Sequence, residues 1–401
     1  MNRNLWLMVA AQGLFLTNNV VFVAINGLVG LSLAPYSWMA TLPILGYVVG
    51  GAASTGPVAW SQSRWGRKVS FQIGLAVAFL SALLATYAVI SVNFWLLVVA
   101  TVVAGYYSAN GQLYRFAAAE LARPGYRERA VSIVLAGGIL GGLIGPNLAR
   151  WTQHLGSAPF AGAYATLAVV ALVSMALVSL VRFPPVPQKK KETGGGRPLW
   201  VIMRQPVFIV STAAAAFGYG IMNVLMAASP IAMQVGGHPF KDVALVLEWH
   251  VIGMFAPGFV TGRLINRFGV ISIMSVGVVL NTLCIAIALS GVEVMHFVIS
   301  MFLVGVGWNF LFTAGTALSL KAYRPEERDK TQGAINFWVF AMMTISSFSS
   351  GALVTTQGWT LLNYISLIPV ALTGIAVLWY VLQDRRRHAT ESSNHSNVGH
   401  G

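Results

Sequence analysis

The chain has 401 residues, of which 56% are hydrophobic and only 9% are charged. A soluble domain carries roughly 25% charged residues, so this composition excludes a soluble globular protein and indicates a polytopic membrane protein. The formal net charge of +14 does not indicate a nucleic-acid partner, because the basic residues fall almost wholly in short gaps between apolar segments, where they determine membrane topology.

Apolar segments recur along the whole chain, each near the roughly 20 residues that a spanning helix needs. The expected spans are 5–30, 37–60, 69–91, 94–117, 129–151, 159–182, 207–234, 241–264, 270–290, 295–320, 332–355 and 360–382. The sequence therefore predicts an all-α polytopic membrane protein with 12 transmembrane helices.

Basic residues mark one set of alternating gaps. Arg64, Arg67 and Lys68 follow the second span, and similar basic residues follow the fourth, sixth, eighth, tenth and twelfth spans. The opposite gaps hold little more than Arg150 and Lys241. By the positive-inside rule, both termini are expected in the cytoplasm.

The longest gap divides the chain into two halves of six spans each. It contains a proline-rich stretch, three consecutive lysines and three consecutive glycines, a composition typical of a flexible linker. The expected organisation is an N-terminal six-helix bundle at 1–182, a cytoplasmic linker at 183–206, a C-terminal six-helix bundle at 207–383 and a disordered cytoplasmic tail at 384–401.

A sequence repeat relates the two halves. Arg64-Trp-Gly-Arg-Lys68 is echoed by Asn266-Arg-Phe-Gly269, with the two glycines 203 positions apart. Arg123-Pro-Gly-Tyr-Arg-Glu-Arg129 is echoed by Arg324-Pro-Glu-Glu-Arg-Asp-Lys330, at an offset of 201. Two echoes at nearly one offset indicate a duplication, as in transporters built from repeated bundles.

Twelve spans in two related halves, with a Gly-x-x-x-Asp-Arg-x-Gly-type loop after the second and eighth spans, resemble the major facilitator superfamily. Gly262-Arg-Leu-Ile-Asn-Arg-Phe-Gly269 is the better copy, with Asn266 in the usual place of aspartate. The first copy has Ala59 and Ser63 where glycine and aspartate are expected, and Gly141-Gly-x-x-Gly-Pro146 is similar to the Gly-Pro element of the fifth helix. The resemblance covers the whole chain and implies the major facilitator fold, with a weakened cytoplasmic charge relay.

Two pairs of ligand-type side chains lie in consecutive spans of the second half. Met222 and Met226 are four positions apart in the seventh span, as are His250 and Met254 in the eighth, so each pair shares one helix face. Thioether sulfur and imidazole nitrogen suit copper, and thioether in particular suits Cu(I). Methionine is also a common filler of apolar helices, whereas an imidazole in hydrocarbon is costly without a partner. The pattern leaves a metal path and apolar packing both open.

Other polar residues in the spans are candidates for supporting roles. Glu248 would carry a coupling proton or pair with a basic group of the other half, and Arg115 would bind an anionic group or extend to the cytoplasmic surface. Polar side chains within spans usually face the bundle interior, and those expected to line the cavity are Asn18, Asn19, Asn110, Trp308 and Asn309. Four residues lie near the outer ends of the spans: Met233, His238, Met295 and His296. They would form either an entry relay for the substrate or an ordinary interfacial layer.

A narrower resemblance comes from the Met-x-x-x-Met and His-x-x-x-Met pairs. Together with Gly237-His-Pro-Phe240 and Trp249-His-Val-Ile-Gly-Met-Phe-Ala-Pro257, they resemble the CcoA-like copper importers, a subfamily related to riboflavin transporters. The resemblance implies that Met222, Met226, His250 and Met254 are metal ligands, and that copper, the transported substrate rather than a cofactor, supplies the cbb-type cytochrome c oxidase. We therefore expect a monomeric secondary active transporter that imports copper across the bacterial inner membrane by alternating access.

An enzyme is not expected. The spans carry almost no acids, no phosphate-cradling glycine loop precedes a Lys-Ser/Thr pair, and the single cysteine, Cys284, excludes a cysteine-based metal cluster. The alternative to copper import is import of riboflavin or another small organic solute on the same fold, with Trp308, Tyr106, Tyr107 and Phe217 stacking on a planar ring. A non-transporting sensor or assembly factor on the same scaffold is the remaining alternative.

Overall fold

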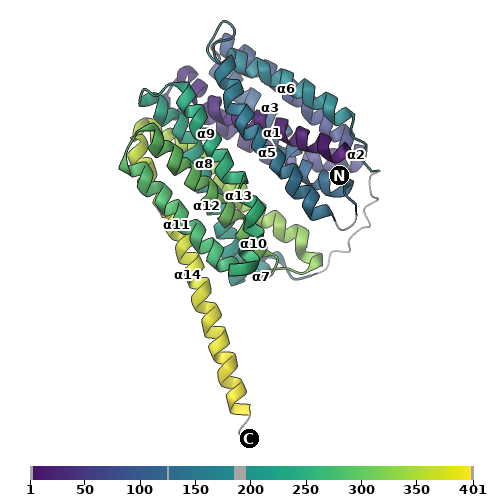
Figure 1. Ribbon diagram of the computed structural model, residues 1–401, viewed down its shortest axis with the longest axis vertical. Helices are drawn as coiled ribbons and strands as arrows, with labels where there is room; N and C mark the ends of the chain where they lie inside the picture. Colours follow the sequence, from purple (N-terminus) through teal and green to yellow (C-terminus); the bar gives the residue numbers. More distant parts are fainter. Residues whose placement is uncertain (1–2, 124–125, 185–195, 399–401) are drawn as a thin grey trace.

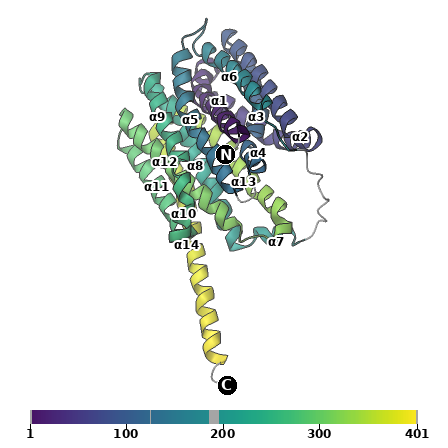
Figure 2. The same ribbon diagram turned by 45° about the vertical axis from the view of Figure 1, so that its right-hand side comes forward.

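Nearly all of the chain is helical in the computed structural model, which describes the backbone of residues 3–123, 126–184 and 196–398 (Figures 1 and 2). Most of the expected linker, residues 185–195, lies outside the described residues. The helices of the first half are α1 (Arg3–Leu33), the 3-10 helix η1 (Ser37–Met39), α2 (Leu42–Ile90), α3 (Phe94–Gly111), α4 (Tyr114–Leu121), α5 (Arg127–Thr152) and α6 (Ala161–Ser179). Those that follow are α7 (Leu199–Met203), α8 (Pro206–Val235), α9 (Phe240–Phe255), α10 (Gly258–Phe268), α11 (Val270–Ser290), α12 (Val294–Ser319), the 3-10 helix η2 (Pro325–Glu327), α13 (Arg328–Thr356) and α14 (Gly358–Val398).

The helices account for all twelve predicted spans. In the described chain, 10 helical stretches are long and apolar enough to cross a membrane, and α9 with α10 gives an eleventh, bent by 41°. One of the 10, Ser37–Ile90, has 54 residues, a length of about 80 Å at 1.5 Å per residue, more than twice the hydrocarbon thickness. Its backbone leaves the helical conformation at Gly66 (φ 82°, ψ 171°), so this stretch contains two crossing segments.

Glycines with positive φ recur at matching places in the two halves. Gly66 after the second span and Gly269 after the eighth have φ values of 82° and 86°. Gly156 after α5 and Gly358 after α13, 202 positions apart, have φ values of 103° and 81°. Residues with a Cβ rarely adopt a positive φ, so the turns at these four positions require glycine. The repeated backbone geometry supports the duplication that the sequence echoes indicate.

The two halves are joined at the end of the molecule opposite to the basic loops, which we call the far end. Across the halves, α5 packs against α9, α2 against α13, and α1 against α8. The Thr41 hydroxyl donates to the Ser347 carbonyl oxygen at 2.7 Å and accepts from the Gly351 N–H at 3.0 Å. The rings of Phe160 and Phe240 meet edge to face, with centroids 5.1 Å apart. Hydrogen bonds and ring contacts therefore close the far end.

The other end, which carries the basic loops, is called the basic end. Two glycines lie toward it, on helices that pack across the halves elsewhere along their length: Gly56 on α2 and Gly333 on α13. A Cβ added at either would meet no atom within 4 Å. At these positions the interface helices have no close neighbour, so contact between the halves weakens toward the basic end.

The last helix extends beyond its expected end at residue 383. In Figure 1, α14 (yellow) leaves the bundle and continues to Val398. The stretch 384–398, expected to be disordered from its polar composition, is thus helical in the structure. It contains no proline or glycine, and a helix that already exists in a span extends without a new nucleation cost.

A buried carboxylate fastens the end of the linker to the second half. The Glu327 side chain is 0% exposed and accepts from the Arg197 Nη2 at 2.7 Å, the Arg197 backbone N–H at 2.7 Å and the Arg324 backbone N–H at 3.0 Å. Lys330 Nζ donates to the Arg197 carbonyl oxygen at 2.6 Å. The Arg197 guanidinium and these N–H groups hold the pKa of the Glu327 carboxyl well below its ordinary value.

We expect Glu327→Gln to lower the melting temperature of the purified protein at neutral pH, because the amide loses the charge-assisted bonds to Arg197. A carboxyl whose folded pKa is depressed contributes stability above its unfolded pKa of about 4.3, and this contribution is lost as the pH falls toward the folded pKa. The melting temperatures of parent and variant should therefore converge as the pH falls below about 4. Glu326→Gln, at the exposed neighbouring position, is the matched control. A constant difference at all pH values would contradict the assignment.

Candidate functional site

The eighth span is broken where the two predicted ligand pairs are expected to meet the substrate. α9 ends at Phe255, and Pro257, which has no N–H, leaves the Gly253 carbonyl oxygen without its donor. The Met254 carbonyl oxygen, whose partner four residues later would be Gly258 at the start of α10, also lacks a helical donor at this break. Asn309 on α12 replaces that partner, because its Nδ2 donates to the Met254 carbonyl oxygen at 2.8 Å. The Thr261 hydroxyl on α10 donates to Asn309 Oδ1 at 2.7 Å. One buried amide on α12 thus holds both sides of the break, and discontinuous helices of this kind form the binding sites of many transporters.

His250 is fully buried on α9, and its imidazole has one protein partner. Its Nδ1 lies 2.8 Å from the carbonyl oxygen of Met301 on α12, and its Nε2 has no hydrogen-bond partner. The contact depends on a close approach of α9 and α12: a Cβ at Gly305 would lie 2.6 Å from the His250 carbonyl oxygen, and one at Gly253 would lie 2.5 Å from the Phe302 carbonyl oxygen. The structure thus supplies a structural partner for the buried imidazole and leaves its second nitrogen free.

The predicted thioether ligands are buried in one apolar cluster. Met222, Met226 and Met233 on α8 and Met254 on α9 are at most 8% exposed, and all belong to the cluster that also contains Trp308. Helix α12 packs against both α8 and α9 and lies at the centre of this region. Among the described residues, no group of three or more His, Cys, Asp or Glu side chains could hold a metal ion. Any metal site here would depend on His250 and the methionines.

Four aromatic rings gather beside the break, on three helices of the second half. Tyr219 on α8 meets Trp308 on α12 edge to face at 5.3 Å, and Trp308 is stacked with Phe312 at 5.4 Å and an interplanar angle of 10°. Phe255 at the end of α9 meets Trp308 at 6.3 Å, and it also packs against a second apolar cluster, made of first-half residues that include Phe15 and Phe71. The Trp308 Nε1 is buried and has no hydrogen-bond partner. This aromatic cluster therefore borders the first half and carries an unused N–H donor.

The first half contributes a cation to the same region. The fourth span breaks between α3 and α4, and Arg115, in the first turn of α4, lies near enough to Tyr219 of the other half for its charge to act on the phenol group. Its Nε is buried without a hydrogen-bond partner, and its guanidinium carbon lies 4.9 Å from the centre of the Phe116 ring. Of the two sequence expectations, the structure thus favours an inward-facing Arg115 over one that extends to the surface.

The asparagines of the first and fourth helices have different environments. Asn18 on α1 is 2% exposed, and its Nδ2 has no hydrogen-bond partner. Asn19 Nδ2 donates to the Tyr47 hydroxyl at 3.3 Å. Asn110 accepts from the Ser70 hydroxyl at 3.0 Å and supports the contact of α3 with α2. Asn18 alone of these three offers an unused donor.

Glu248 faces the other half rather than His250. Its carboxylate accepts a short hydrogen bond from Asn147 Nδ2 on α5, and Arg150, one turn farther along α5, interacts with it electrostatically. The sequence left open whether Glu248 pairs with a basic group of the other half. In the structure its direct partner is the neutral amide of Asn147, and the cation of Arg150 lies nearby.

The residues predicted near the outer span ends do not form one relay. His238 Nε2 contacts the Val292 carbonyl oxygen at 2.9 Å, which ties the α8–α9 turn to the loop before α12. Met295 is 58% exposed and lines a shallow apolar hollow between α9 and α12. His296 Nδ1 is buried beside Gly291, and Met233 lies in the apolar cluster. We find no contact that links these four side chains.

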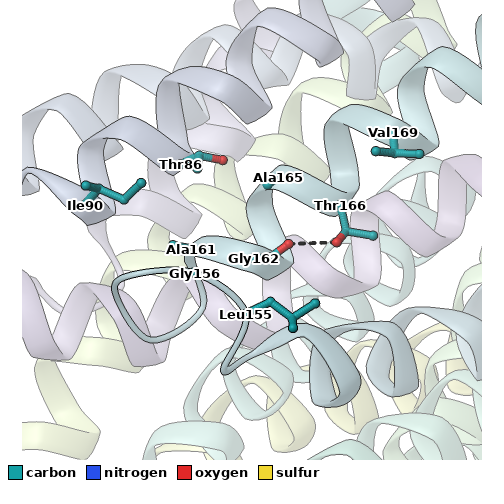
Figure 3. A pocket seen from close by; sticks show the side chains of 9 residues that line it. All are labelled: Thr86, Ile90, Leu155, Gly156, Ala161, Gly162, Ala165, Thr166 and Val169. Carbon is teal, nitrogen blue, oxygen red and sulfur yellow. Dashed lines mark hydrogen bonds between the residues drawn. The ribbon is translucent and has the colours of Figure 1, made fainter.

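A larger hollow lies on the first half, away from all of these residues. Its volume is about 350 Å³. Figure 3 shows that the end of α2, the α5–α6 turn and α6 line it. The Thr166 hydroxyl, one of its few polar groups, already donates to the Gly162 carbonyl oxygen at 2.7 Å. Because its polar groups are satisfied within the protein, this hollow offers little to fix a polar solute.

Sequence reasoning missed Tyr219, Phe312 and Asn147. Tyr219 lies three residues before Met222 and seven before Met226, so helical spacing places it on the same face as these methionines. Phe312 lies four residues after Trp308 and shares its helix face in the same way. Conversely, Tyr107 does not join the aromatic cluster, because it packs against Phe15 at 5.4 Å within the first half.

Comparison with known proteins agrees with this architecture. The sequence model of the Major Facilitator Superfamily matches residues 5–256 and 223–398. The riboflavin transporter RfnT of Brucella anthropi is 36% identical over 380 residues, which cover 94% of this chain and 95% of that protein. The uncharacterized MFS-type transporter YddS of Bacillus subtilis is 25% identical over 85% of this chain and 82% of its own length.

Solved structures show the same fold at low sequence identity. The nucleoside transporter NupG superposes with a TM-score of 0.73 at 12% identity, over 95% of this chain and 99% of that one. An inward-facing bacterial homologue of the lysosomal transporter Spinster gives a TM-score of 0.68 at 14% identity, over 96% and 98% of the two chains. With a family match along both halves and a relative of this identity and coverage, the chain belongs to the Major Facilitator Superfamily and is a secondary transporter.

Proposed function

We propose that this transporter imports riboflavin or a closely similar planar heterocycle across the bacterial inner membrane. The observation that carries the proposal is the cluster of Tyr219, Phe255, Trp308 and Phe312 at the boundary between the halves. Flat aromatic side chains bind a flat ring system by stacking. The full-length similarity to a riboflavin transporter supports the same substrate class.

Unused donors around the cluster suit the polar edge of such a ring. The carbonyl oxygens and ring nitrogens of riboflavin accept hydrogen bonds. Among the described residues, Trp308 Nε1 in the cluster and Arg115 Nε, whose guanidinium acts on Tyr219, are buried donors without a partner, and leaving such groups unsatisfied costs about 1–3 kcal/mol each. A bound heterocycle would satisfy donors of this kind, whereas a bare cation would not.

The proposed orientation places the basic end in the cytoplasm. The far end is closed by the Thr41 and Phe160 contacts, and the interface helices lack close neighbours near the basic end. In this orientation the structure corresponds to the state that releases substrate to the cytoplasm. The test is uptake of radiolabelled riboflavin by a riboflavin-auxotrophic bacterium that lacks its own transporter. Uptake and growth rescue that are insensitive to added copper are expected, and absent uptake with normal membrane expression would contradict the proposal.

Copper import is the second candidate, favoured by the free Nε2 of His250 near a methionine-rich cluster. The first observation against it is that the Met301 carbonyl oxygen already gives His250 a structural partner. The second is that the methionines lie among apolar side chains, where they need no metal.

Joint replacement of Met222 and Met226 by leucine separates the two candidates. Leucine conserves volume, and such exchanges usually cost less than about 1.5 kcal/mol, so we expect riboflavin uptake to stay within about twofold of the parent. A copper carrier would lose radioactive copper accumulation, because both thioether ligands are gone. Loss of copper uptake with unchanged riboflavin uptake would show that this site also carries the metal.

A further inference from the structure

A single carboxyl group lies within the spans at the interface between the halves. Asp242 lies in the first turn of α9, whereas Glu248 is two turns deeper and half-buried against α5 of the other half. In the described residues, no other Asp or Glu lies inside a span away from its ends. An acid at this depth is costly to keep ionised and needs a reason to be present.

The surroundings of Glu248 hold one charge. Helix α9 packs against α12, α5, α8, α1 and α10, and of their ionisable groups Arg150 on α5 is the one that acts on Glu248. On α9 itself, Lys241 and Asp242 lie at its start, and His250 is bound to Met301 on α12, about 200° around the helix from Glu248. The remaining ionisable side chains that the structure describes on these helices lie toward helix ends or in the aromatic cluster: Arg3, Tyr219, Arg263, Arg267 and His296.

The direct partner of Glu248 suits a neutral carboxyl group. Asn147 Nδ2 donates to Glu248 Oε1 and also to the Leu143 carbonyl oxygen at 2.9 Å. A protonated Glu248 can in turn donate to Asn147 Oδ1, which makes a paired acid–amide contact with no net charge. An ionised Glu248 would keep one bond to the amide and would lose water each time the halves close. Closing the α5–α9 interface therefore favours the protonated form.

We propose that Glu248 is the proton-binding site that couples closure of the far end to proton uptake, with Asn147 as its positioning residue. When the halves separate at the far end, the carboxylate meets water and takes a proton from that side. The neutral acid then closes against Asn147, and the proton leaves to the cytoplasm before the carrier reopens outward. One proton would thus move inward with each cycle of closure and reopening of the far end. The substrate in this inference is the one proposed above, and its site follows from the geometry of the α5–α9 interface.

The first test measures closure without any substrate. Cysteines are placed at Phe160 and Phe240, whose rings meet across the same interface, after the buried Cys284 is replaced by serine. Because the thiolate is the reacting species, cross-linking by a short bifunctional thiol reagent is divided at each pH by the reaction of the two single-cysteine variants with a monofunctional reagent. In the parent this ratio should fall several-fold as the pH rises from about 5 to about 8. In Glu248→Gln, which mimics the neutral acid, the ratio should stay high at every pH. A parent without pH dependence, or a variant that keeps it, would overturn the proposal.

The second test separates coupling from binding in proteoliposomes. Exchange of labelled for unlabelled riboflavin at equal pH needs no net proton movement, so Glu248→Gln should retain it. Accumulation driven by an acidic exterior should be lost in Glu248→Gln and retained in Asp242→Asn, the control acid on the same helix. Gradient-driven accumulation by Glu248→Gln would refute the coupling role. If the parent itself shows no riboflavin exchange, the substrate proposal fails, and the cross-linking result still decides the role of Glu248.

Discussion

Replacing Trp308 by alanine is expected to reduce riboflavin uptake by about tenfold or more. Trp308 contacts Tyr219, Phe255 and Phe312, so it is the ring that organises the aromatic cluster. Stacking of a base on an aromatic side chain is worth about 1–3 kcal/mol, and each 1.4 kcal/mol is about tenfold in affinity. The loss of the Nε1–H donor adds to this effect, since that donor has no partner among the residues that the structure describes. The measurement is the initial uptake rate at matched amounts of protein in the membrane.

Because a buried tryptophan also supports the fold, its removal costs stability as well, by about 3–5 kcal/mol. Trp308→Phe keeps a ring and should restore most of the uptake, and riboflavin should raise the melting temperature of the purified parent but not of Trp308→Ala. Trp95→Ala, at a position 56% exposed on α3, controls for the loss of a tryptophan. Unchanged uptake per folded molecule of Trp308→Ala would remove the aromatic cluster from the substrate path.

Much of the fold could be predicted from hydropathy, because a bilayer leaves helices as the way to satisfy the backbone of each apolar segment. The turn at Gly66 and its counterpart at Gly269 could also be located, since the sequence repeat marks both. The helical continuation of α14 to Val398 was missed because a polar composition indicates contact with water and does not fix the backbone conformation. A helix that already exists can propagate through polar residues.

The site was harder to predict because its contacts depend on how helices approach one another. The burial cost of His250 correctly indicated that it needs a partner, but the partner is the Met301 backbone carbonyl, brought close by Gly253 and Gly305. No side-chain pattern announces a backbone acceptor on another helix. For the same reason Asn147 was not connected with Glu248, since they are 101 positions apart in the sequence.

Replacing Asn309 by leucine is expected to have the largest effect on stability among the polar residues of the site. The leucine is similar in volume, but it leaves the Met254 carbonyl oxygen without its 2.8 Å donor and the Thr261 hydroxyl without its 2.7 Å acceptor. A buried group left unsatisfied costs about 1–3 kcal/mol. The Thr261 hydroxyl can still bind the Pro257 carbonyl oxygen, so the Met254 carbonyl oxygen accounts for most of the loss. The measurement is the free energy of unfolding, or the melting temperature, of the purified protein in detergent.

A double-mutant cycle with Thr261→Val shows whether Asn309 joins α9 to α10 or only fills space. If Asn309 bonds both sides of the break, Thr261→Val should cost less in the Asn309→Leu background than alone, with a coupling of about 0.5 kcal/mol or more. Strictly additive losses would mean that the hydroxyl does not use the amide. The bend at Pro257 would then depend on proline alone, and the cost of Asn309→Leu would have to come from the Met254 carbonyl oxygen. Coupling would instead make Asn309 the element that fixes the break beside the proposed substrate site.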